Sequence, residues 1–267
     1  MALFAAHNVT QKYDDVTIIE DINISVHEGE IVCLIGSSGV GKTTLFHVLS
    51  GINMPTEGSV TLQGEDITGK SGHVSYMLQK DMLLPFKTIE DNVSLPYRVK
   101  GVHKKEARAK VASYFKTFGL EGVEKKYPSQ LSGGMRQRAA FMRTYFFGQK
   151  VMLLDEPFSA LDEITKSDMY GWYLNISREL RLTTIFISHS LDEAITLADR
   201  VLVMGGRPGS IVMEMSIDKS GESDFTTSAK FMEYKRRLKA ALSGNVDNMM
   251  DTNTANASDV KDVEENL

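Results

Sequence analysis

The stretch that most constrains the fold of this chain is GSSGVGKTT, at residues 36–44, which stands between two apolar segments. Residues 31–35 before it are all apolar and predict a buried strand, whereas residues 44–50 after it predict the start of a helix. A glycine-rich turn at that junction lets backbone N–H groups close around a phosphate chain, and the helix N-terminus adds a partial positive charge. The pattern therefore predicts a phosphate-binding P-loop, formed by Gly36, Ser37, Ser38, Gly39, Val40, Gly41, Lys42, Thr43 and Thr44.

Two side chains of this loop have chemical roles that the pattern predicts. Lys42 would reach the β- and γ-phosphates of a nucleoside triphosphate, and the hydroxyl of Thr43 would bind Mg²⁺. The alternative interpretation is a turn rich in glycine and serine that matches the pattern by chance. The two interpretations differ in what they require elsewhere, since a triphosphate-hydrolysing site also needs acidic side chains at strand ends.

The composition places the chain among soluble globular proteins. It has 267 residues, of which 42% are apolar and 24% charged, and no apolar run approaches the ~20 residues that span a bilayer. Its formal net charge of -5 arises within residues 245–267, so the remainder is nearly neutral and gives no sign of a nucleic-acid partner. The N-terminus lacks the features of a signal peptide, and the only cysteine, Cys33, is expected as a buried side chain in a reducing compartment.

Acidic side chains follow a predicted strand in the second half of the chain. Residues 151–154 are apolar and are followed at once by Asp155 and Glu156. Because ligands of α/β sheets bind beyond the carboxyl ends of strands, these two residues fit a Mg²⁺ ligand and a general base. The alternative is a pair of solvated acids. His189 stands in the same relation to a strand predicted at residues 184–188, where it would hydrogen-bond a γ-phosphate or the attacking water.

Residues 80–149 predict a helical insertion between the halves of the nucleotide-binding sheet. The sequences LLPF and SLPY interrupt the chain with prolines, and residues 104–118 follow as one amphipathic helix. The basic side chains of this helix fall mostly away from its apolar face, which favours a solvated surface; contact with another protein is the alternative. These side chains are Lys104, Lys105, Arg108 and Lys110.

A second anion-binding feature lies in the same insertion, at LSGGM, residues 131–135. Ser132 would cap the helix predicted at residues 136–147, and Gly133 and Gly134 would leave backbone N–H groups exposed at the helix start. The alternative interpretation is a plain helix cap, since serine is common at that position. Under the first interpretation, the chain carries two separate devices for binding phosphate.

The rest of the chain predicts strands, further helices and a polar tail. Residues 3–26 predict two short strands joined by a turn that contains Tyr13, which is either a surface aromatic or a platform that stacks on a base. A helix over residues 164–180 contains the only tryptophan, Trp172, which is expected in the core. Residues 245–267 are acidic and polar, so they are expected to be disordered. Further strands are predicted at residues 58–62, 73–78, 201–204 and 210–217, and a last helix at residues 226–243.

Together, these motifs resemble the ATP-binding cassette (ABC) ATPase family over residues 1–215. They occur in the family's order: Tyr13, GSSGVGKTT, Gln79, LSGGM, VMLLDEP, SALD and His189. The resemblance implies an α/β P-loop NTPase cassette with a mainly parallel core sheet, an N-terminal antiparallel β subdomain and a helical subdomain, at residues 80–149, that bears LSGGM. The whole cassette domain would occupy residues 1–244.

The resemblance also implies roles for single residues. Two cassettes would pair head to tail around two ATP molecules, so that Ser132, Gly133 and Gly134 of one copy meet the γ-phosphate held by Lys42 of the other. Within one copy, the implied roles are adenine stacking for Tyr13, Mg²⁺ binding for Thr43, Gln79 and Asp155, positioning of the attacking water for Gln79, proton abstraction for Glu156, γ-phosphate contact for His189, and communication across the dimer for Asp162.

Within this family, the chain is most similar to importers of nitrate, sulfonate, taurine and other small organic solutes. The similarity is carried by LSGGMRQR, the LLPF after Gln79, DEPFSALD, LDEAITLADRVLVM and the RPG turn. Three departures from the family pattern are Met135 where glutamine is commoner, serines on both sides of His189 where Thr-His-Asp is usual, and YFF at residues 145–147 where small residues are usual. The methionine itself fits this importer branch.

This similarity implies a peripheral protein on the cytoplasmic face of the inner membrane, which works with integral membrane permease subunits and, through them, with a solute-binding protein. Hydrolysis would separate the dimer, and the motion would pass to the permease through residues 79–98. Two alternatives remain. An exporter or lipid-handling cassette would share the catalytic residues, whereas a non-transport ATPase of DNA repair or translation would carry a long coiled-coil insertion or a second P-loop, which this sequence lacks.

Overall fold

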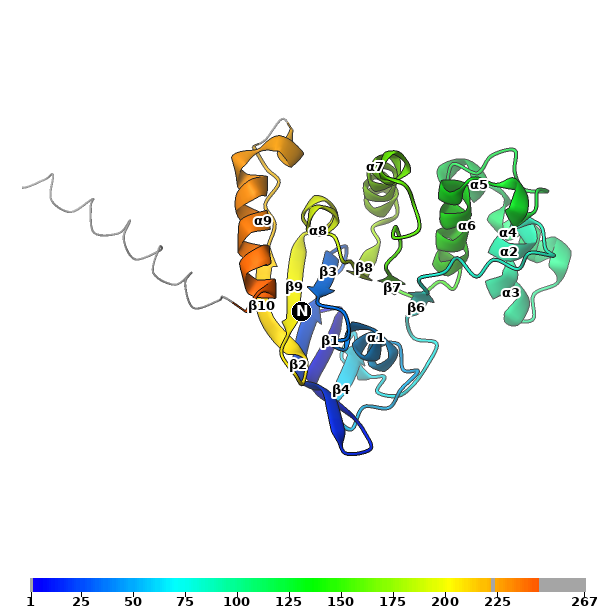
Figure 1. Cartoon of the computed structure of the whole chain (residues 1–267). Helices are drawn as coiled ribbons and strands as arrows, with labels where there is room; N and C mark the ends of the chain where they lie inside the picture. Colours follow the sequence, from blue (N-terminus) through cyan, green and yellow to red (C-terminus); the bar gives the residue numbers. More distant parts are fainter. Residues whose placement is uncertain (1, 222–223, 245–267) are drawn as a thin grey trace, which may run out of the picture.

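The computed structural model describes residues 2–221 and 224–244, and it contains two sheets with helices packed around them (Figure 1). The first sheet is antiparallel in its β1–β2, β1–β4 and β4–β5 pairings. The strands predicted over residues 3–26 are long rather than short, and they pair from Phe4–Val26 to Tyr13–Val16 with irregularities between Ala6 and Lys12. In spatial order, this sheet consists of β2 (Val16–Val26), β1 (Phe4–Tyr13), β4 (Glu57–Leu62) and β5 (Glu65–Asp66).

The second sheet is the core of the molecule and is parallel except for one edge strand. The central strand β3 is buried at every residue, which explains its unbroken apolar run. Only β10 pairs antiparallel, with β9, among the described strands of this sheet. In spatial order, its strands are β10 (Ser210–Ser216), β9 (Arg200–Gly205), β3 (Ile31–Gly36), β8 (Thr183–Ile187), β7 (Val151–Asp155) and β6 (Ser75–Met77).

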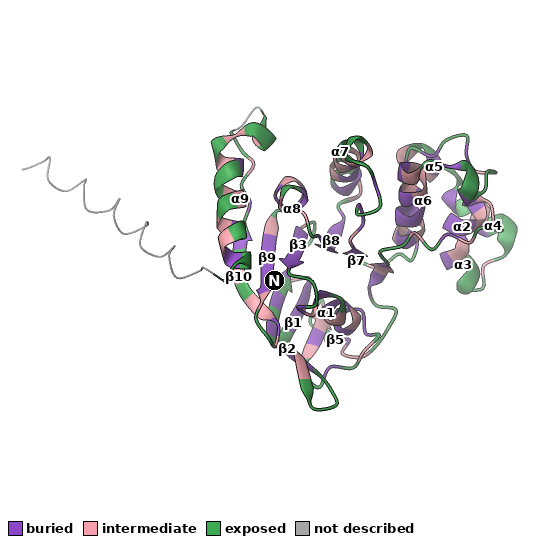
Figure 2. Cartoon of the chain, viewed as in Figure 1, coloured by how far each residue is buried: buried purple, intermediate pink, exposed green. Residues whose placement is uncertain are grey.

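The two faces of β3 belong to two different hydrophobic clusters, because successive side chains of a strand point to opposite faces. Val32 and Leu34 pack with helix α1 (Lys42–Leu49) and the antiparallel sheet. Cys33 packs on the opposite face, where the helices are α7 (Glu163–Leu180), α8 (Leu191–Leu197) and α9 (Ala229–Leu242). The expected burial of Cys33 is confirmed, and burial raises the pKa of its thiol. Figure 2 shows the buried residues on the strands and on the sheet-facing sides of these helices.

The helical insertion contains more helices than the sequence predicts. It comprises α2 (Ile89–Val93), α3 (Leu95–Val99), α4 (Lys104–Ala112), α5 (Tyr114–Thr117) and α6 (Gly133–Tyr145), which gather at one end of the molecule (Figure 1). The single helix predicted over residues 104–118 is wrong, because the chain divides at Ser113 into α4 and α5. Pro96 does not interrupt structure but lies in the first turn of α3, where proline costs no backbone hydrogen bond. Helix α8 was not predicted.

Trp172 and the basic face of α4 also bear on the sequence predictions. Trp172 is partly buried and packs against the core, with its ring centroid 5.4 Å from that of Phe141, as expected. The basic face is not simply solvated. Arg108 donates from Nε and Nη2 to Asp91 at 2.8 Å each, and its Nη1 lies 2.9 Å from Glu90 Oε1.

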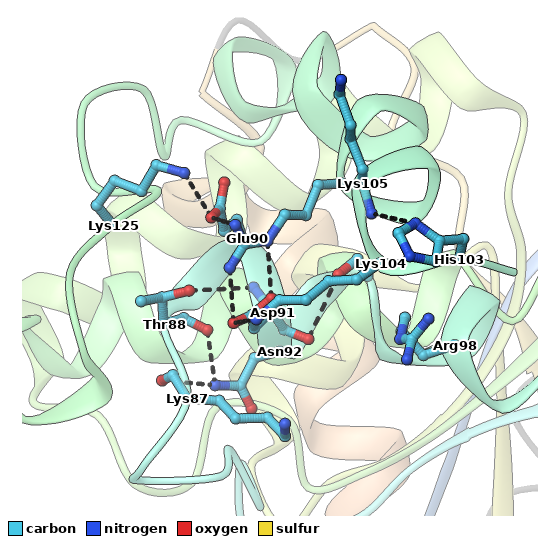
Figure 3. Close-up of polar contacts among 12 residues, drawn as sticks. Lys87, Thr88, Glu90, Asp91, Asn92, Arg98, His103, Lys104, Lys105 and Lys125 are labelled. Atoms are coloured by element: carbon cyan, nitrogen blue, oxygen red, sulfur yellow. Dashed lines mark hydrogen bonds and ion pairs between the residues drawn. The ribbon is translucent and has the colours of Figure 1, made fainter.

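These contacts join α4 to α2 through two carboxylates that are almost covered. The side chains of Glu90 and Asp91 are only 11% and 13% exposed. Lys104 also contacts Asp91, at 3.2 Å, and Lys125 contacts Glu90, at 2.6 Å (Figure 3). The cations hold the charges of α2 in place, since a covered carboxylate without a partner would be costly.

Replacement of Arg108 by methionine is expected to destabilise the fold by about 1–3 kcal/mol, because two covered carboxylates lose their shared partner. Hydrogen bonds from Arg108 hold the pKa of Asp91 below its ordinary value of 3.8. The stabilisation from this pair is therefore present above that value and lost as the pH falls through the lower folded-state pKa. Urea unfolding at pH 7 and at acidic pH measures both effects. Lys110→Met is the control, since Lys110 pairs with the exposed Glu106.

Candidate functional site

The P-loop lies between β3 and α1, and its shape depends on two glycines. A Cβ at Gly36 would lie 2.6 Å from the carbonyl oxygen of Met204, so no larger residue fits without a shift of the backbone. Gly41 has a φ of 104° and caps α1, and a Cβ there would lie 2.5 Å from Ile19 Cγ2. Between them, Ser37, Ser38 and Gly39 are exposed, and Gly39 has only backbone atoms to expose, whereas Val40 is buried. The loop thus presents backbone to solvent at the start of a helix, as the sequence predicts.

Lys42 lies inside this loop. Its Nζ donates to the carbonyl oxygens of Gly36 and Ser37, at 2.8 and 3.0 Å. Burial lowers the pKa of its ammonium group, and the negative charges of Glu156 and Asp155 oppose that shift. Both predicted carboxylates thus favour the charged form of the lysine. The neighbouring Thr43 is exposed and Thr44 half-buried in the first turn of α1.

The two carboxylates lie at the end of β7, where Asp155 is its last residue and Glu156 follows, and they differ in environment. Asp155 is 9% exposed and accepts a 3.4 Å hydrogen bond from the hydroxyl of Tyr76. Burial, and secondly the charge of Glu156, raises the pKa of Asp155. Glu156 has a φ of 47°, in the left-handed region that residues with a side chain rarely adopt. Such strain occurs preferentially at functional sites, where the surrounding structure maintains it.

Both oxygens of Glu156 have polar partners from neighbouring strands. The amide of Gln79 donates to Oε2 at 2.9 Å, and His189 Nε2 lies 2.7 Å from Oε1. Gln79 follows β6, Glu156 follows β7 and His189 follows β8, and these three strands are adjacent in the core sheet. The structure therefore brings together three predicted site residues that are far apart in the sequence.

The predicted residues of LSGGM form a second group, around the start of α6. The predicted cap is confirmed, because the Ser132 side chain accepts a hydrogen bond from the backbone N–H of Met135 at 3.3 Å. Asp162 caps α7 and accepts from the backbone N–H of Thr165 at 3.0 Å. The two caps are close, since a Cβ at Gly134 would lie 3.1 Å from Thr165 Cγ2.

These two groups of predicted site residues are separate within one chain. Helices α6 and α1 lie apart in Figure 1, and no hydrogen bond among the described residues joins Ser132, Gly133, Gly134 or Asp162 to the P-loop. One link runs from α6 to the segment after the carboxylates, where the amide of Gln137 donates to the carbonyl of Pro157. The predicted residues of the two groups therefore do not meet within one copy of the chain.

A cavity lies beside the P-loop, next to the turn that follows Tyr13. Its volume is about 450 Å³, and residues 15–18, Gly39, Val40 and 206–209 line it. Tyr13 itself is 45% exposed, and its hydroxyl accepts a 2.6 Å hydrogen bond from Asn53. The sequence did not predict that residues 206–209 line this cavity. They lie far from the P-loop in sequence and contain no phosphate-binding motif.

Two other polar residues near the site were not predicted either. Tyr76, which contacts Asp155, lies on β6 three residues before Gln79, and that proximity was the available signal. Glu193 is only 4% exposed and accepts a 3.3 Å hydrogen bond from the hydroxyl of Tyr170. Burial raises the pKa of Glu193 to about 7. Glu193 lies in α8, the helix that the sequence did not predict.

The donor set fits Mg²⁺ bound together with phosphates. Within the described ranges, no three His, Cys, Asp or Glu side chains converge to hold a metal by themselves. Mg²⁺ is commonly held by one or two carboxylates plus substrate phosphates, and Asp155 and Thr43 offer oxygens of that kind. None of the helices in the described part of the chain is long and apolar enough to cross a membrane.

A P-loop at the end of a central parallel strand, with a carboxylate pair at the end of β7, defines a P-loop nucleotide-binding ATPase. The chain belongs to the ABC transporter family, whose model, described as "ABC transporter", matches residues 19–159. It is a cassette ATPase of that family with the expected α/β cassette fold.

Individual relatives agree with this assignment. The chain is 41% identical to the nitrate import ATP-binding protein NrtD of Synechococcus elongatus, with 77% of each chain covered. It is 37% identical to the formylaminopyrimidine import ATP-binding protein ThiZ of Halalkalibacterium halodurans, with 83% of this chain and 87% of that protein covered. Among solved structures, it matches the dimeric, post-hydrolysis state of the cassette MJ0796 bound to ADP and Pi, with a TM-score of 0.68, 25% identity and coverage of 80% and 99%.

Proposed function

We propose that this chain is the ATP-hydrolysing subunit of a membrane importer for a small solute. The observation that carries the hydrolytic part is the placement of Glu156, whose two oxygens contact Gln79 and His189 at the ends of three neighbouring strands. The P-loop follows β3, the next strand of the same sheet. Import is supported by the names of the relatives, which are import proteins for nitrate and formylaminopyrimidine.

Within one copy, the P-loop amides and Lys42 bind the phosphates of ATP, and Tyr13 stacks on the adenine beside the 450 Å³ cavity. Thr43 and Asp155 hold Mg²⁺, with Gln79 nearby. When bound, the metal neutralises phosphate charge. Glu156 accepts a proton from the attacking water, because its carboxylate is fixed and only 17% exposed. Gln79 and His189 orient the water and contact the γ-phosphate.

A second copy completes the site. Ser132, Gly133 and Gly134 start a helix whose backbone N–H groups suit an anion, yet they lie apart from the P-loop of their own chain. In a head-to-tail dimer, they contact the γ-phosphate bound by the other copy, and Asp162 communicates across the interface. The similar cassette MJ0796, whose solved structure is a dimer bound to ADP and Pi, supports this arrangement.

The partner is an integral membrane permease that binds the segment after Gln79. Met82 and Phe86 are 57% and 73% exposed there, which is unusual for large apolar side chains so close together in sequence. The permease in turn works with a solute-binding protein. Bound to the permease, the chain is a peripheral protein at the cytoplasmic face of the inner membrane. The solute is nitrate, a sulfonate, taurine or another small organic compound, such as a heterocycle of the formylaminopyrimidine kind.

A gentle-detergent pull-down of the tagged chain from its native membranes tests this proposal. We expect a multi-span permease and a solute-binding protein to co-purify. Phe86→Asp should remove both, whereas Met232→Asp should keep them, since Met232 is 60% exposed on α9, outside the proposed contact segment. Co-purification of an export complex would identify the exporter alternative, and recovery with ribosomes or repair proteins would contradict a transport function.

A further inference from the structure

One side chain of α6 holds the backbone of residues 79–84, the segment that leads from the catalytic edge of the core sheet to the helical insertion. Arg143, in the last turn of α6, donates from Nη1 to the carbonyl of Met82 at 2.7 Å and from Nη2 to the carbonyl of Asp81 at 2.5 Å. Burial lowers the pKa of its guanidinium, which nevertheless stays charged in proteins. Its planar fork suits two converging carbonyls better than a single ammonium would.

The backbone that Arg143 holds is in a conformation that needs support. Met82 has a φ of 46°, in the left-handed region, and its side chain is 57% exposed, so packing does not fix it. Asp81 adds two contacts: Oδ1 accepts from the backbone N–H of Leu83 at 3.1 Å, and Oδ2 lies 3.4 Å from Nε of Arg136. The far end of the segment is held by α2, where Asn92 exchanges two hydrogen bonds with Leu84. Its middle, at Asp81 and Met82, is held by α6.

The same segment reaches the catalytic carboxylate at its other end. Gln79 donates to Glu156 Oε2 at 2.9 Å, and Asp81 is only two residues further along the chain. Arg136 and Arg143 lie two turns apart on one face of α6, the helix that begins at the Ser132 cap. One helix therefore connects Ser132 to the backbone beside Gln79.

We propose that Arg143 is a positioning residue for hydrolysis, which fixes residues 79–84 to α6 so that the Gln79–Glu156 contact forms only when α6 is in place. The proposal rests on the proposed function, because it concerns the same hydrolytic site. Displacement of α6 as its Ser132 end engages the nucleotide of the second copy would be transmitted through two carbonyl contacts to Gln79. In each copy, the Gln79–Glu156 contact would thereby depend on whether the second copy is bound.

The test compares the variants Arg143→Met and Arg143→Lys with Arg138→Met as the control. Arg138 is on the same helix but lies over the Trp172 ring, 5.2 Å from its centroid. Arg143→Met should lower kcat by about tenfold and change KM for ATP by no more than about twofold. The variant loses a contact that positions Gln79 for hydrolysis, and this contact does not contribute to ATP binding. Backbone amides of residues 80–84 should exchange with solvent about tenfold faster without nucleotide, since a held segment becomes free. Arg143→Lys should recover part of both effects.

A double variant tests whether Arg143 acts through Gln79. Gln79→Ala combined with Arg143→Met should be no slower than Gln79→Ala alone, because the two changes break one pathway. Additive losses, or unchanged exchange at residues 80–84 in both Arg143 variants, would overturn the proposal, as would the same losses in Arg138→Met. The exchange measurement distinguishes the two proposals. If the wild-type chain had no ATPase activity, the proposed function would be wrong. Faster exchange in Arg143→Met would still show that Arg143 holds residues 80–84.

Discussion

Replacing Glu156 with glutamine should lower ATP turnover by about 10²- to 10⁴-fold while ATP stays bound and the dimer stays closed. The amide keeps the size of the side chain but replaces one of its two acceptor oxygens with a donor, so it retains only one of the contacts with Gln79 and His189. It also no longer accepts a proton from water at neutral pH. Phosphate release measures the turnover, and light scattering with ATP measures the dimer. Glu233→Gln is the control, because Glu233 pairs with Arg236 on α9 and should leave both quantities unchanged.

Two outcomes of that experiment would contradict the assignment. Turnover close to wild type would show that another group accepts the proton. A chain that no longer binds ATP would show that Glu156 supports the nucleotide pocket itself.

The Lys42→Ala variant should fail at the earlier step. Loss of one charged hydrogen bond to phosphate is expected to weaken ATP binding by about 10- to 100-fold, since such a bond is worth about 1.5–3 kcal/mol. Calorimetric titration with ATP gives the affinity, and thermal unfolding without nucleotide separates binding from folding. Lys110→Ala is the control, because Lys110 makes only an exposed pair with Glu106 and lies near the Tyr97 ring. Unchanged affinity in Lys42→Ala would remove Lys42 from the phosphate site.

The sequence was most informative where a short motif also sets local structure. The P-loop, the acidic pair after residues 151–154 and the Ser132 cap all depend on neighbours in the chain, and the structure has strands and helices where those motifs require them. Helices α2 and α3 are absent from the prediction because the prolines of LLPF and SLPY are interpreted there as interruptions. In fact, proline is compatible with a first helical turn.

Contacts between distant segments could not be predicted in the same way. The Tyr76–Asp155 hydrogen bond depends on the order of β6 and β7 in the sheet, which no local pattern specifies. The left-handed backbone of Glu156 is likewise invisible in the sequence, because glutamate does not mark that conformation as glycine does. The proposed catalytic roles and domain limits remain predictions, and the tail at residues 245–267 lies outside the described residues.

The burial of Cys33 has a practical consequence for following this protein in solution. Its thiol is completely covered at the centre of the core sheet, and burial raises its pKa, so little reactive thiolate reaches a labelling reagent in the folded state. Since it is the only cysteine of the chain, a cysteine introduced on the surface would carry a fluorescent dye at a single defined position. Distances between two labelled copies could then report dimer closure in real time, without first removing a native thiol.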